Sequence, residues 1–158
     1  MLIYYWVFFI NFIFSIFDLG CRSRLIKKIL LFLVGLLFVL FAGLRWNTGT
    51  DWDNYLYFYE NIKYVEIANS GYELFFELLQ RISFYLFNNY TSMLLLTAII
   101  IITLTYTVLI KFSPYPILSV LMLYSYSINS SGFGYRQDLA IAFCFFFFKY
   151  IHNRNLLG

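Results

Sequence analysis

The sequence predicts an all-α fold, a polytopic transmembrane helical bundle, on two observations. The first is composition: 62% of the 158 residues are hydrophobic and only 12% are charged, whereas soluble domains contain roughly 25% charged residues. The second is patterning, because the apolar residues form continuous runs rather than the short alternating segments of a transmembrane barrel. We therefore expect about five membrane spans plus one amphipathic helix on the extracytoplasmic side, all within a single transmembrane domain, residues 1–158.

Five apolar runs are expected to cross the membrane. They are Leu2–Phe17, Ile29–Leu44, Thr91–Ile110, Ile117–Ile128 and Leu139–Ile151, joined by polar connections at Asp18–Lys28, Arg45–Ser70, Lys111–Pro116 and Asn129–Arg136. The first two runs are near the lower length limit for a hydrocarbon core of roughly 30 Å, so flanking residues must complete them. The first run also lacks a basic n-region and a small-residue cleavage site, which indicates a retained anchor rather than a signal peptide.

The segment Tyr72–Phe87 is predicted to be the amphipathic helix. Four polar residues recur in it at helical spacing against apolar neighbours: Glu73, Glu77, Gln80 and Arg81. Glu77 and Arg81 stand four residues apart in the favourable order for an ion pair. Such a helix lies in the membrane interface or crosses the membrane with its polar face toward the bundle. The alternative for Glu73 and Glu77 is a solvated helix face without a function.

The distribution of charge predicts the orientation. With Tyr72–Phe87 in the interface, one side of the membrane holds Arg22, Arg24, Lys27, Lys28, Lys111, Lys149 and Arg154 with Asp18 alone, and the other side holds Arg45, Lys63, Arg81 and Arg136 with the remaining carboxylates. The positive-inside rule makes the first side cytoplasmic and places the N-terminus outside. If Tyr72–Phe87 crossed the membrane, Arg136 would instead lie on the opposite face from Arg45, so the charge bias favours five spans.

With this topology, two polar segments meet on the extracytoplasmic face. The first, Arg45–Tyr59, turns through Gly49 and carries Asp51 and Asp53 among tryptophan and tyrosine residues. The second, Ser130–Asp138, contains two glycines that free the backbone to turn. A helix opens after them, at about Arg136-Gln137. A helix N-terminus beside an arginine can bind an anion, and the planar guanidinium suits the oxygens of a phosphate.

Simpler interpretations of the same residues stay open. Arg45 and Arg136 can extend from helix ends toward solvent, and Asp138 can neutralise Arg136 or complement the dipole of its helix. The aromatic residues can form an interfacial belt instead of a platform for sugars. Asp51 is harder to explain as a structural residue, because it follows Gly49-Thr50 in a loop with no helix to cap.

Several other kinds of site have no support in the sequence. No pattern for a zinc site, a P-loop, a dinucleotide fold or a nucleophile elbow occurs. Neither Cys21 nor Cys144 suggests a disulfide or a metal site, and His152 has no ligand partners nearby in the sequence. We expect no metal and no cofactor. We also exclude nucleic acid as a partner, because the basic residues lie at membrane edges.

Three short motifs resemble the EpsG family of Wzy-type polysaccharide polymerases. Gly43-Leu44-Arg45, Gly49-Thr50-Asp51 and Tyr55 are similar to the family's GLR…GTD…Y signature. Gly71-Tyr72-Glu73 lies where the family often has a glutamate-proline-glycine stretch, although the proline is absent and the order differs. Gly134-Tyr135-Arg136-Gln137 and the following Leu139–Ala142 resemble N-G-I-R-Q-x-L-A-x-A, with Phe133-Gly134-Tyr135 in place of asparagine-glycine-isoleucine. The resemblance spans nearly the whole chain and about the first half of the family's usual length, so we expect the N-terminal part of a longer polymerase.

The resemblance implies a membrane glycosyltransferase in the bacterial inner, or cytoplasmic, membrane, multi-pass and with an extracytoplasmic active face. Family members are taken to polymerise oligosaccharide repeat units carried on undecaprenyl diphosphate, in capsule, exopolysaccharide or O-antigen biosynthesis. The implied partners are the undecaprenyl-diphosphate-linked glycan, membrane lipids, and a chain-length regulator or other polysaccharide-export proteins. No metal is required in this scheme, because arginines take its role.

The resemblance also implies roles for particular residues. Arg45, Arg136 and Gln137 would bind the diphosphate, and Asp51 or Glu73 would be the catalytic base. The loops would be shaped by Gly49, Thr50, Gly132 and Gly134, and the sugars would contact Trp52 and Tyr55. Three other functions remain as alternatives: an O-antigen ligase-like transferase, a transport or flippase subunit for the lipid-linked glycan, and a structural or assembly subunit. Transporters place ionisable groups near the midplane, whereas the charges here gather at one face.

Overall fold

The protein is an all-helical membrane bundle. The computed structural model describes residues 2–21, 23–45, 47, 51–66, 71–129 and 135–153, and every regular element in these ranges is an α-helix. The helices are α1 (Leu2–Gly20), α2 (Arg24–Gly43), α3 (Trp52–Glu60), α4 (Leu74–Phe87), α5 (Tyr90–Phe112), α6 (Pro116–Asn129) and α7 (Tyr135–Asn153). The predicted fold class is therefore confirmed.

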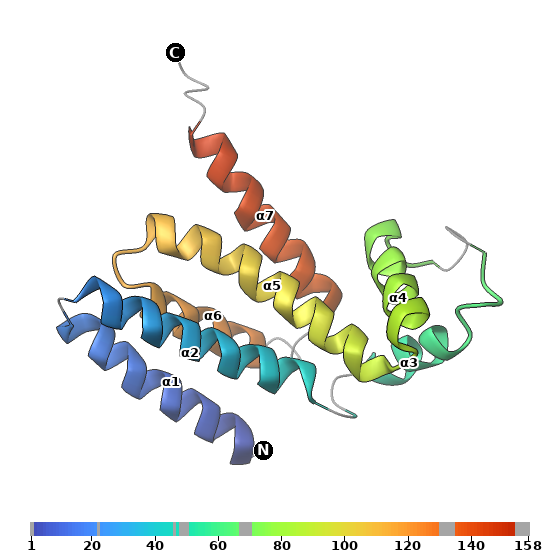
Figure 1. The fold of residues 1–158 in the computed structure, drawn as a ribbon, viewed down its shortest axis with the longest axis horizontal. Helices are drawn as coiled ribbons and strands as arrows, with labels where there is room; N and C mark the ends of the chain where they lie inside the picture. The colour runs from blue at the N-terminus through green and yellow to red at the C-terminus, as the bar shows by residue number, and fades with distance from the viewer. Residues whose placement is uncertain are drawn as a thin grey trace.

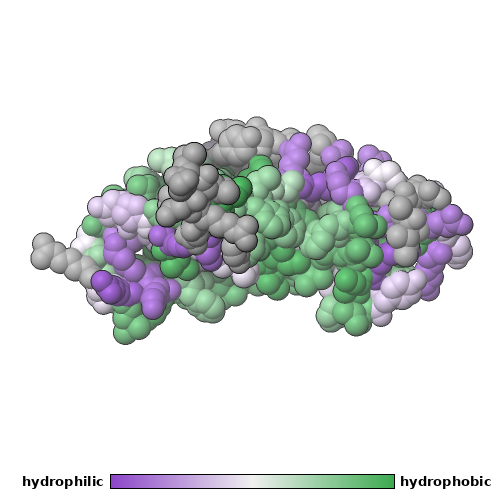
Figure 2. Space-filling model, turned by 90° about the horizontal axis from the view of Figure 1, so that it is seen from above, coloured by the Kyte–Doolittle hydropathy of each residue, from purple (hydrophilic) through white to green (hydrophobic). Residues whose placement is uncertain are grey.

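The long helix α5 organises the bundle (Figure 1). It packs against α2, α7 and α6 along its length and against α4 near its beginning, while α1 packs on α6 and α2. The short helices α3 and α4 lie together beyond one end of the long helices. Figure 2 shows hydrophobic residues across the middle of one face and most hydrophilic residues toward its two ends, as expected for a protein that spans a membrane.

Among the described residues, fewer helices than the five predicted spans meet the length and composition of a membrane crossing. Within the described ranges, three helical segments are long and apolar enough to cross a membrane: Ile3–Gly20, Arg24–Gly43 and Tyr90–Phe112. Helix α6 has 14 residues, fewer than the roughly 20 that a span requires. Helix α7 has 19 residues but includes Arg136, Asp138 and Lys149. The membrane crossing of α6 and α7 therefore stays a prediction.

Several helices extend beyond the apolar runs that predicted them. Helix α1 continues to Gly20 and α2 begins at Arg24, so the expected connection Asp18–Lys28 is wrong and only residues 21–23 separate the two helices. Two polar residues in these extensions, Asp18 of α1 and Lys27 of α2, form an ion pair with each other. Helix α4 begins two residues later than expected, and α7 begins at Tyr135, one residue earlier.

Asp18 shows how a charged residue is accommodated inside α1. Its carboxylate is fully buried and accepts a hydrogen bond of 3.1 Å from the backbone nitrogen of Ile117, in the first turn of α6. Its other oxygen lies 3.2 Å from the Nζ of Lys27 in α2. A carboxylate at a helix N-terminus satisfies a free N–H group and complements the helix dipole. Asp18 therefore ties α1, α2 and α6 together at the end of the bundle opposite α3.

Helix α3 was not predicted. It occupies Trp52–Glu60, inside the segment expected to be an irregular connection, and Asp51 stands at its N-cap position without a capping hydrogen bond from its side chain. The expectation that Asp51 has no helix to cap is therefore wrong. The signal was present, because the buried residues Trp52, Tyr55 and Tyr59 recur at spacings of three and four. The polar residues among the aromatic ones concealed this periodicity.

The polar face of α4 points into the protein. Glu77 and Gln80 are fully buried, so the interpretation of Glu77 as part of a solvated face is wrong. The predicted pair with Arg81 is confirmed, with 2.7 Å between Arg81 Nη2 and Glu77 Oε1. Arg81 also donates hydrogen bonds to the carbonyl oxygens of Ile62, at 3.1 Å, and Val65, at 2.6 Å. The pair thereby holds the segment after α3 against α4.

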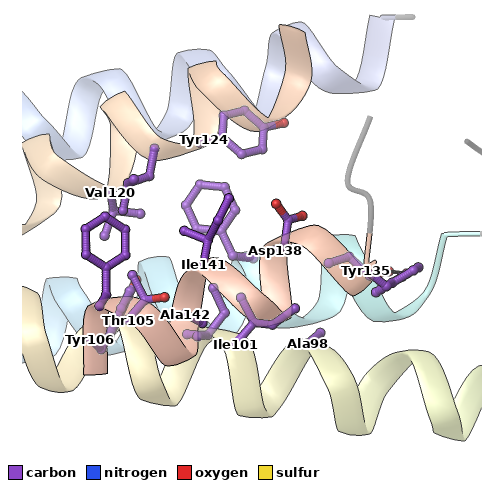
Figure 3. Close-up of a pocket in the computed structure, with 15 residues that line it drawn as sticks. Ala98, Ile101, Thr105, Tyr106, Val120, Tyr124, Tyr135, Asp138, Ile141 and Ala142 are labelled. Atoms are coloured by element: carbon purple, nitrogen blue, oxygen red, sulfur yellow. Dashed lines mark hydrogen bonds between the residues drawn. The ribbon is translucent and has the colours of Figure 1, made fainter. Parts of the chain in front are cut away.

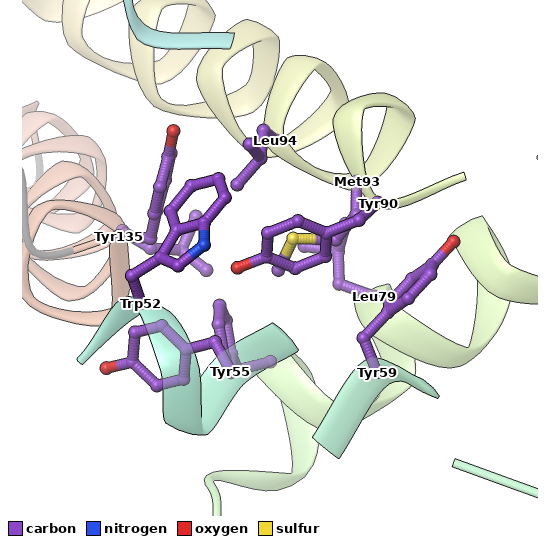
Figure 4. Close-up of a cluster of buried hydrophobic side chains, with 10 residues drawn as sticks. Trp52, Tyr55, Tyr59, Leu79, Tyr90, Met93, Leu94 and Tyr135 are labelled. Atoms are coloured by element: carbon purple, nitrogen blue, oxygen red, sulfur yellow. The ribbon is translucent and has the colours of Figure 1, made fainter. Parts of the chain in front are cut away.

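An aromatic core joins α3 and α4 to α5 and α7 (Figure 4). Trp52 and Tyr59 of α3 both meet Tyr90 of α5 edge-on, with ring centroids 5.1 and 5.3 Å apart. Tyr135 of α7 completes the cluster together with apolar residues of α4 and α5. Edge-to-face contacts of this kind stabilise a core beyond the area that they bury. From the sequence, these aromatic residues were considered as a belt at the membrane interface. In the structure these rings are buried in the core of the protein.

Helices α2 and α5 approach each other closely at Gly43. A Cβ atom at Gly43 would lie 2.5 Å from Leu95 Cδ2 and 2.8 Å from Leu95 Cα. Small residues allow such close contacts between helices in membranes. Because Arg45 follows two residues later, this contact determines where its side chain begins.

Candidate functional site

The candidate site lies where the end of α2, the beginning of α7 and the short helices α3 and α4 meet. Arg45 directly follows the last turn of α2, and Arg136 is the second residue of α7. Tyr135 brings the two together, because it precedes Arg136 in the chain and contacts Arg45. Gly49, Thr50, Gly132 and Gly134, which were predicted to shape the loops, lie outside the described residues.

Arg45 is held inside the protein by Tyr135. Its Nε donates a hydrogen bond of 2.8 Å to the Tyr135 hydroxyl, and its guanidinium carbon lies 4.2 Å from the centre of the Tyr135 ring. The same hydroxyl donates a hydrogen bond of 2.6 Å to the carbonyl oxygen of Ala42, in the last turn of α2. Arg45 is only 9% exposed, which does not fit the alternative that it extends from the helix end into solvent.

Arg136 forms a two-point ion pair with Glu73, the residue before α4. Arg136 Nε donates to Glu73 Oε2 at 2.7 Å, and Nη2 donates to Oε1 at 2.5 Å. The guanidinium carbon also lies 5.2 Å from the centre of the Tyr72 ring. The hydrogen bonds from Arg136 hold the pKa of Glu73 below its ordinary value, and the bonds to Glu73 raise the pKa of Arg136. One interpretation of the sequence was that Asp138 neutralises Arg136. The structure instead pairs Arg136 with Glu73.

Tyr55 links this pair to Asp51. Burial raises the pKa of Tyr55, while a hydrogen bond from Arg136 to the phenol oxygen opposes the increase. The Tyr55 hydroxyl lies 3.5 Å from Asp51 Oδ2, a long contact, and the Asp51 side chain is exposed. Both carboxylates proposed as the base are therefore near Arg136, Glu73 directly and Asp51 through Tyr55.

The remaining predicted residues occupy different environments. Gln137 is exposed in the first turn of α7, next to Arg136. Trp52 and Tyr55 are 4% and 7% exposed, so they contribute to the aromatic core, and their contact with sugars stays a prediction. Within the described ranges no group of three or more histidine, cysteine, aspartate or glutamate residues is placed to hold a metal ion.

A cavity of about 90 Å³ adjoins Tyr135 between α2, α5, α6 and α7 (Figure 3). Its lining is mainly apolar, with Ile101 and Ile141 among the residues that form it. Asp138 points from α7 into the space below α6. Asp138 lies in the first turn of α7, ahead of the expected span Leu139–Ile151. Burial raises its pKa to about 6, while the positive charge of Arg45 opposes the increase.

Neither the role of Tyr135 nor the cavity-facing position of Asp138 was predicted from the sequence. Tyr135 seemed only a substitute for an isoleucine in a motif, yet it connects Arg45 to α2. The one available signal was its position beside Arg136 at a helix start. Burial of Asp138 could not be read from the sequence, because it depends on how α2, α5, α6 and α7 enclose the cavity.

Replacing Tyr135 with phenylalanine is expected to lower the free energy of unfolding by about 1–3 kcal/mol, because a buried carbonyl and a buried guanidinium each lose a partner. Thermal unfolding of the detergent-solubilised protein measures this change. The control is Tyr57→Phe, since the Tyr57 side chain is 71% exposed on α3. Equal melting temperatures for the two variants would contradict the role of the Tyr135 hydroxyl.

Comparison with known proteins places this site within a family. The model of the EpsG family matches residues 28–157, which include Arg45, Glu73 and Arg136. No curated protein and no solved structure matches the chain significantly. The matched residues cover most of the chain, from the first turns of α2 through α7. The chain therefore belongs to the EpsG family.

Proposed function

We propose that the protein polymerises oligosaccharide repeat units that are linked to undecaprenyl diphosphate, at the extracytoplasmic face of the bacterial inner membrane. The product would be a capsule, an exopolysaccharide or an O antigen. Membership of the EpsG family supports a polymerase-like role. The single observation that carries the proposal is that Arg45 binds the hydroxyl of Tyr135, the residue directly before Arg136, at one end of helices that can span a membrane.

The proposed reaction transfers a growing glycan from its lipid carrier. A hydroxyl oxygen of the acceptor repeat unit bonds to the anomeric carbon of the donor, and the bond between that carbon and the diphosphate breaks. The lipid diphosphate leaves with the electron pair, and a carboxylate takes the proton from the hydroxyl. Arg45 and Arg136 would stabilise the negative charge that develops on the diphosphate. A site at the end of the helices suits this substrate, since its lipid lies in the membrane and its sugars lie in water.

The direct test is polymerisation in vesicles that contain the purified full-length protein and lipid-linked repeat units. We expect a ladder of lengthened glycans, with one lipid diphosphate released for each new linkage. Intact single repeat units together with movement of lipid between leaflets would contradict the polymerase and support a flippase. Transfer only to an acceptor that carries no lipid diphosphate would support a ligase instead.

A further inference from the structure

The carboxylate of Glu73 binds Arg136 in the way that a phosphate group would. Its two oxygens accept hydrogen bonds from two nitrogens of the Arg136 guanidinium, at 2.7 and 2.5 Å. Arginine binds carboxylates and phosphates through this same pair of parallel hydrogen bonds. The Nε and Nη2 donors of Arg136 are therefore occupied by a group of the protein itself, and a diphosphate cannot use them until Glu73 leaves.

The ion pair is positioned so that it can exchange. The side chains of Arg136 and Glu73 are 32% and 63% exposed, and ion pairs open to solvent contribute little to stability. The backbone of Glu73 is fixed, because its carbonyl oxygen accepts a hydrogen bond from the backbone nitrogen of Glu77 at 3.0 Å. Rotation of the Glu73 side chain alone is enough to release the guanidinium.

Arg136 keeps other contacts when Glu73 moves away. The Tyr72 ring lies 5.2 Å from its guanidinium carbon, and Tyr55 is near enough that Arg136 opposes the burial-driven increase of the Tyr55 pKa. Both tyrosines are held by ring contacts with each other and with Phe76 of α4. The guanidinium is therefore oriented for an incoming anion without the carboxylate.

We propose that Glu73 occupies the place of the substrate's diphosphate on Arg136 in the ligand-free protein, and that the diphosphate displaces it and thereby frees it to act as the base. This inference rests on the proposed function. It selects Glu73 over Asp51, because the Asp51 carboxylate is 3.5 Å from the Tyr55 hydroxyl and makes no ion pair with Arg136.

The displacement supplies a base at the moment when it is needed. While Glu73 is bound to Arg136, its pKa is lowered and its carboxylate is a weak base. After displacement, Arg136 no longer lowers the pKa of Glu73. The Glu73 carboxylate can then take the proton of the acceptor hydroxyl while the oxygen of that hydroxyl bonds to the anomeric carbon. The bond to the diphosphate breaks in the same step, its electron pair leaves with the lipid diphosphate, and Glu73 later returns the proton to water.

The experiment measures two quantities in variants of the full-length protein in nanodiscs: affinity for inorganic diphosphate by calorimetry, and the rate of glycan growth with saturating lipid-linked units. Glu73→Gln should bind diphosphate about 2- to 5-fold more tightly, since a competing charge is lost. Its growth rate should fall at least about 100-fold, since the base is lost. The control Glu60→Gln, an exposed carboxylate at the end of α3, should change neither quantity.

A second variant separates displacement from loss of the base. Glu73→Asp keeps a carboxylate but is one methylene shorter, which breaks the two-point pair with Arg136. It should bind diphosphate more tightly than the wild type and still extend glycans. Weaker or unchanged diphosphate binding in Glu73→Gln, or growth at the wild-type rate in that variant, would overturn the inference and leave the proposed function standing. Unchanged binding and growth in Arg136→Ala would overturn the proposed function itself.

Discussion

Replacing Arg136 with alanine is expected to abolish glycan polymerisation and to leave single repeat units on the lipid. Loss of one preorganised donor to a developing negative charge costs about 100- to 1,000-fold in rate. Arg136→Lys should fail as well, because an ammonium group cannot offer a diphosphate the two parallel donors that Arg136 directs at Glu73 in this structure. Electrophoresis of glycans from cells that produce each variant measures the chain length.

The matched control is Arg24→Ala. Arg24 is an exposed cation at the first residue of α2, at the end of that helix opposite Arg45, so its loss should leave the chain length unchanged. Comparable amounts of each variant in the membrane must be confirmed by immunoblotting. Polymer of normal length from Arg136→Ala would show that the diphosphate does not depend on this guanidinium.

Replacing Gly43 with valine is expected to destabilise the fold by about 1–3 kcal/mol, the range for overpacked interiors. The first added carbon already lies 2.8 Å from the backbone Cα of Leu95, so α2 and α5 must separate to admit it. Unfolding of the purified protein in a denaturing detergent measures the loss. Because Arg45 follows Gly43 by two residues, glycan growth should fall in the same variant.

Two other glycines provide the comparison series. The atoms nearest to a Cβ at Gly35 would belong to the Tyr106 side chain, the first of them 2.8 Å away, and a side chain can shift more readily than a backbone. A Cβ at Gly20 would meet no atom within 4 Å. We therefore expect destabilisation to decrease from Gly43→Ala through Gly35→Ala to Gly20→Ala, the last being close to neutral. A Gly43→Val protein as stable as the wild type would be incompatible with the close contact of α2 and α5.

The sequence by itself determined the helices and their class. Continuous apolar runs in a chain with few charges predict membrane-spanning helices, and α1, α2 and α5 formed where such runs lie. The pair between Glu77 and Arg81 was predictable because residues four apart are neighbours on the same face of a helix. Short motifs around Arg45 and Arg136 were enough to predict the family that residues 28–157 match.

Only the tertiary structure decided which polar groups meet. Arg45 and Tyr135 are 90 residues apart in the chain, and Arg136 and Glu73 are 63 apart. Hydrophobic periodicity specifies which face of a helix is apolar, but it does not specify the partner that covers a polar face. Asp18 lies buried within α1 because Lys27 of α2 and the N-terminus of α6 meet it there. Arg81, the partner of Glu77, binds backbone carbonyls of the segment after α3. In a membrane, satisfaction of buried charges depends on helix packing, and that packing is a property of the assembled fold.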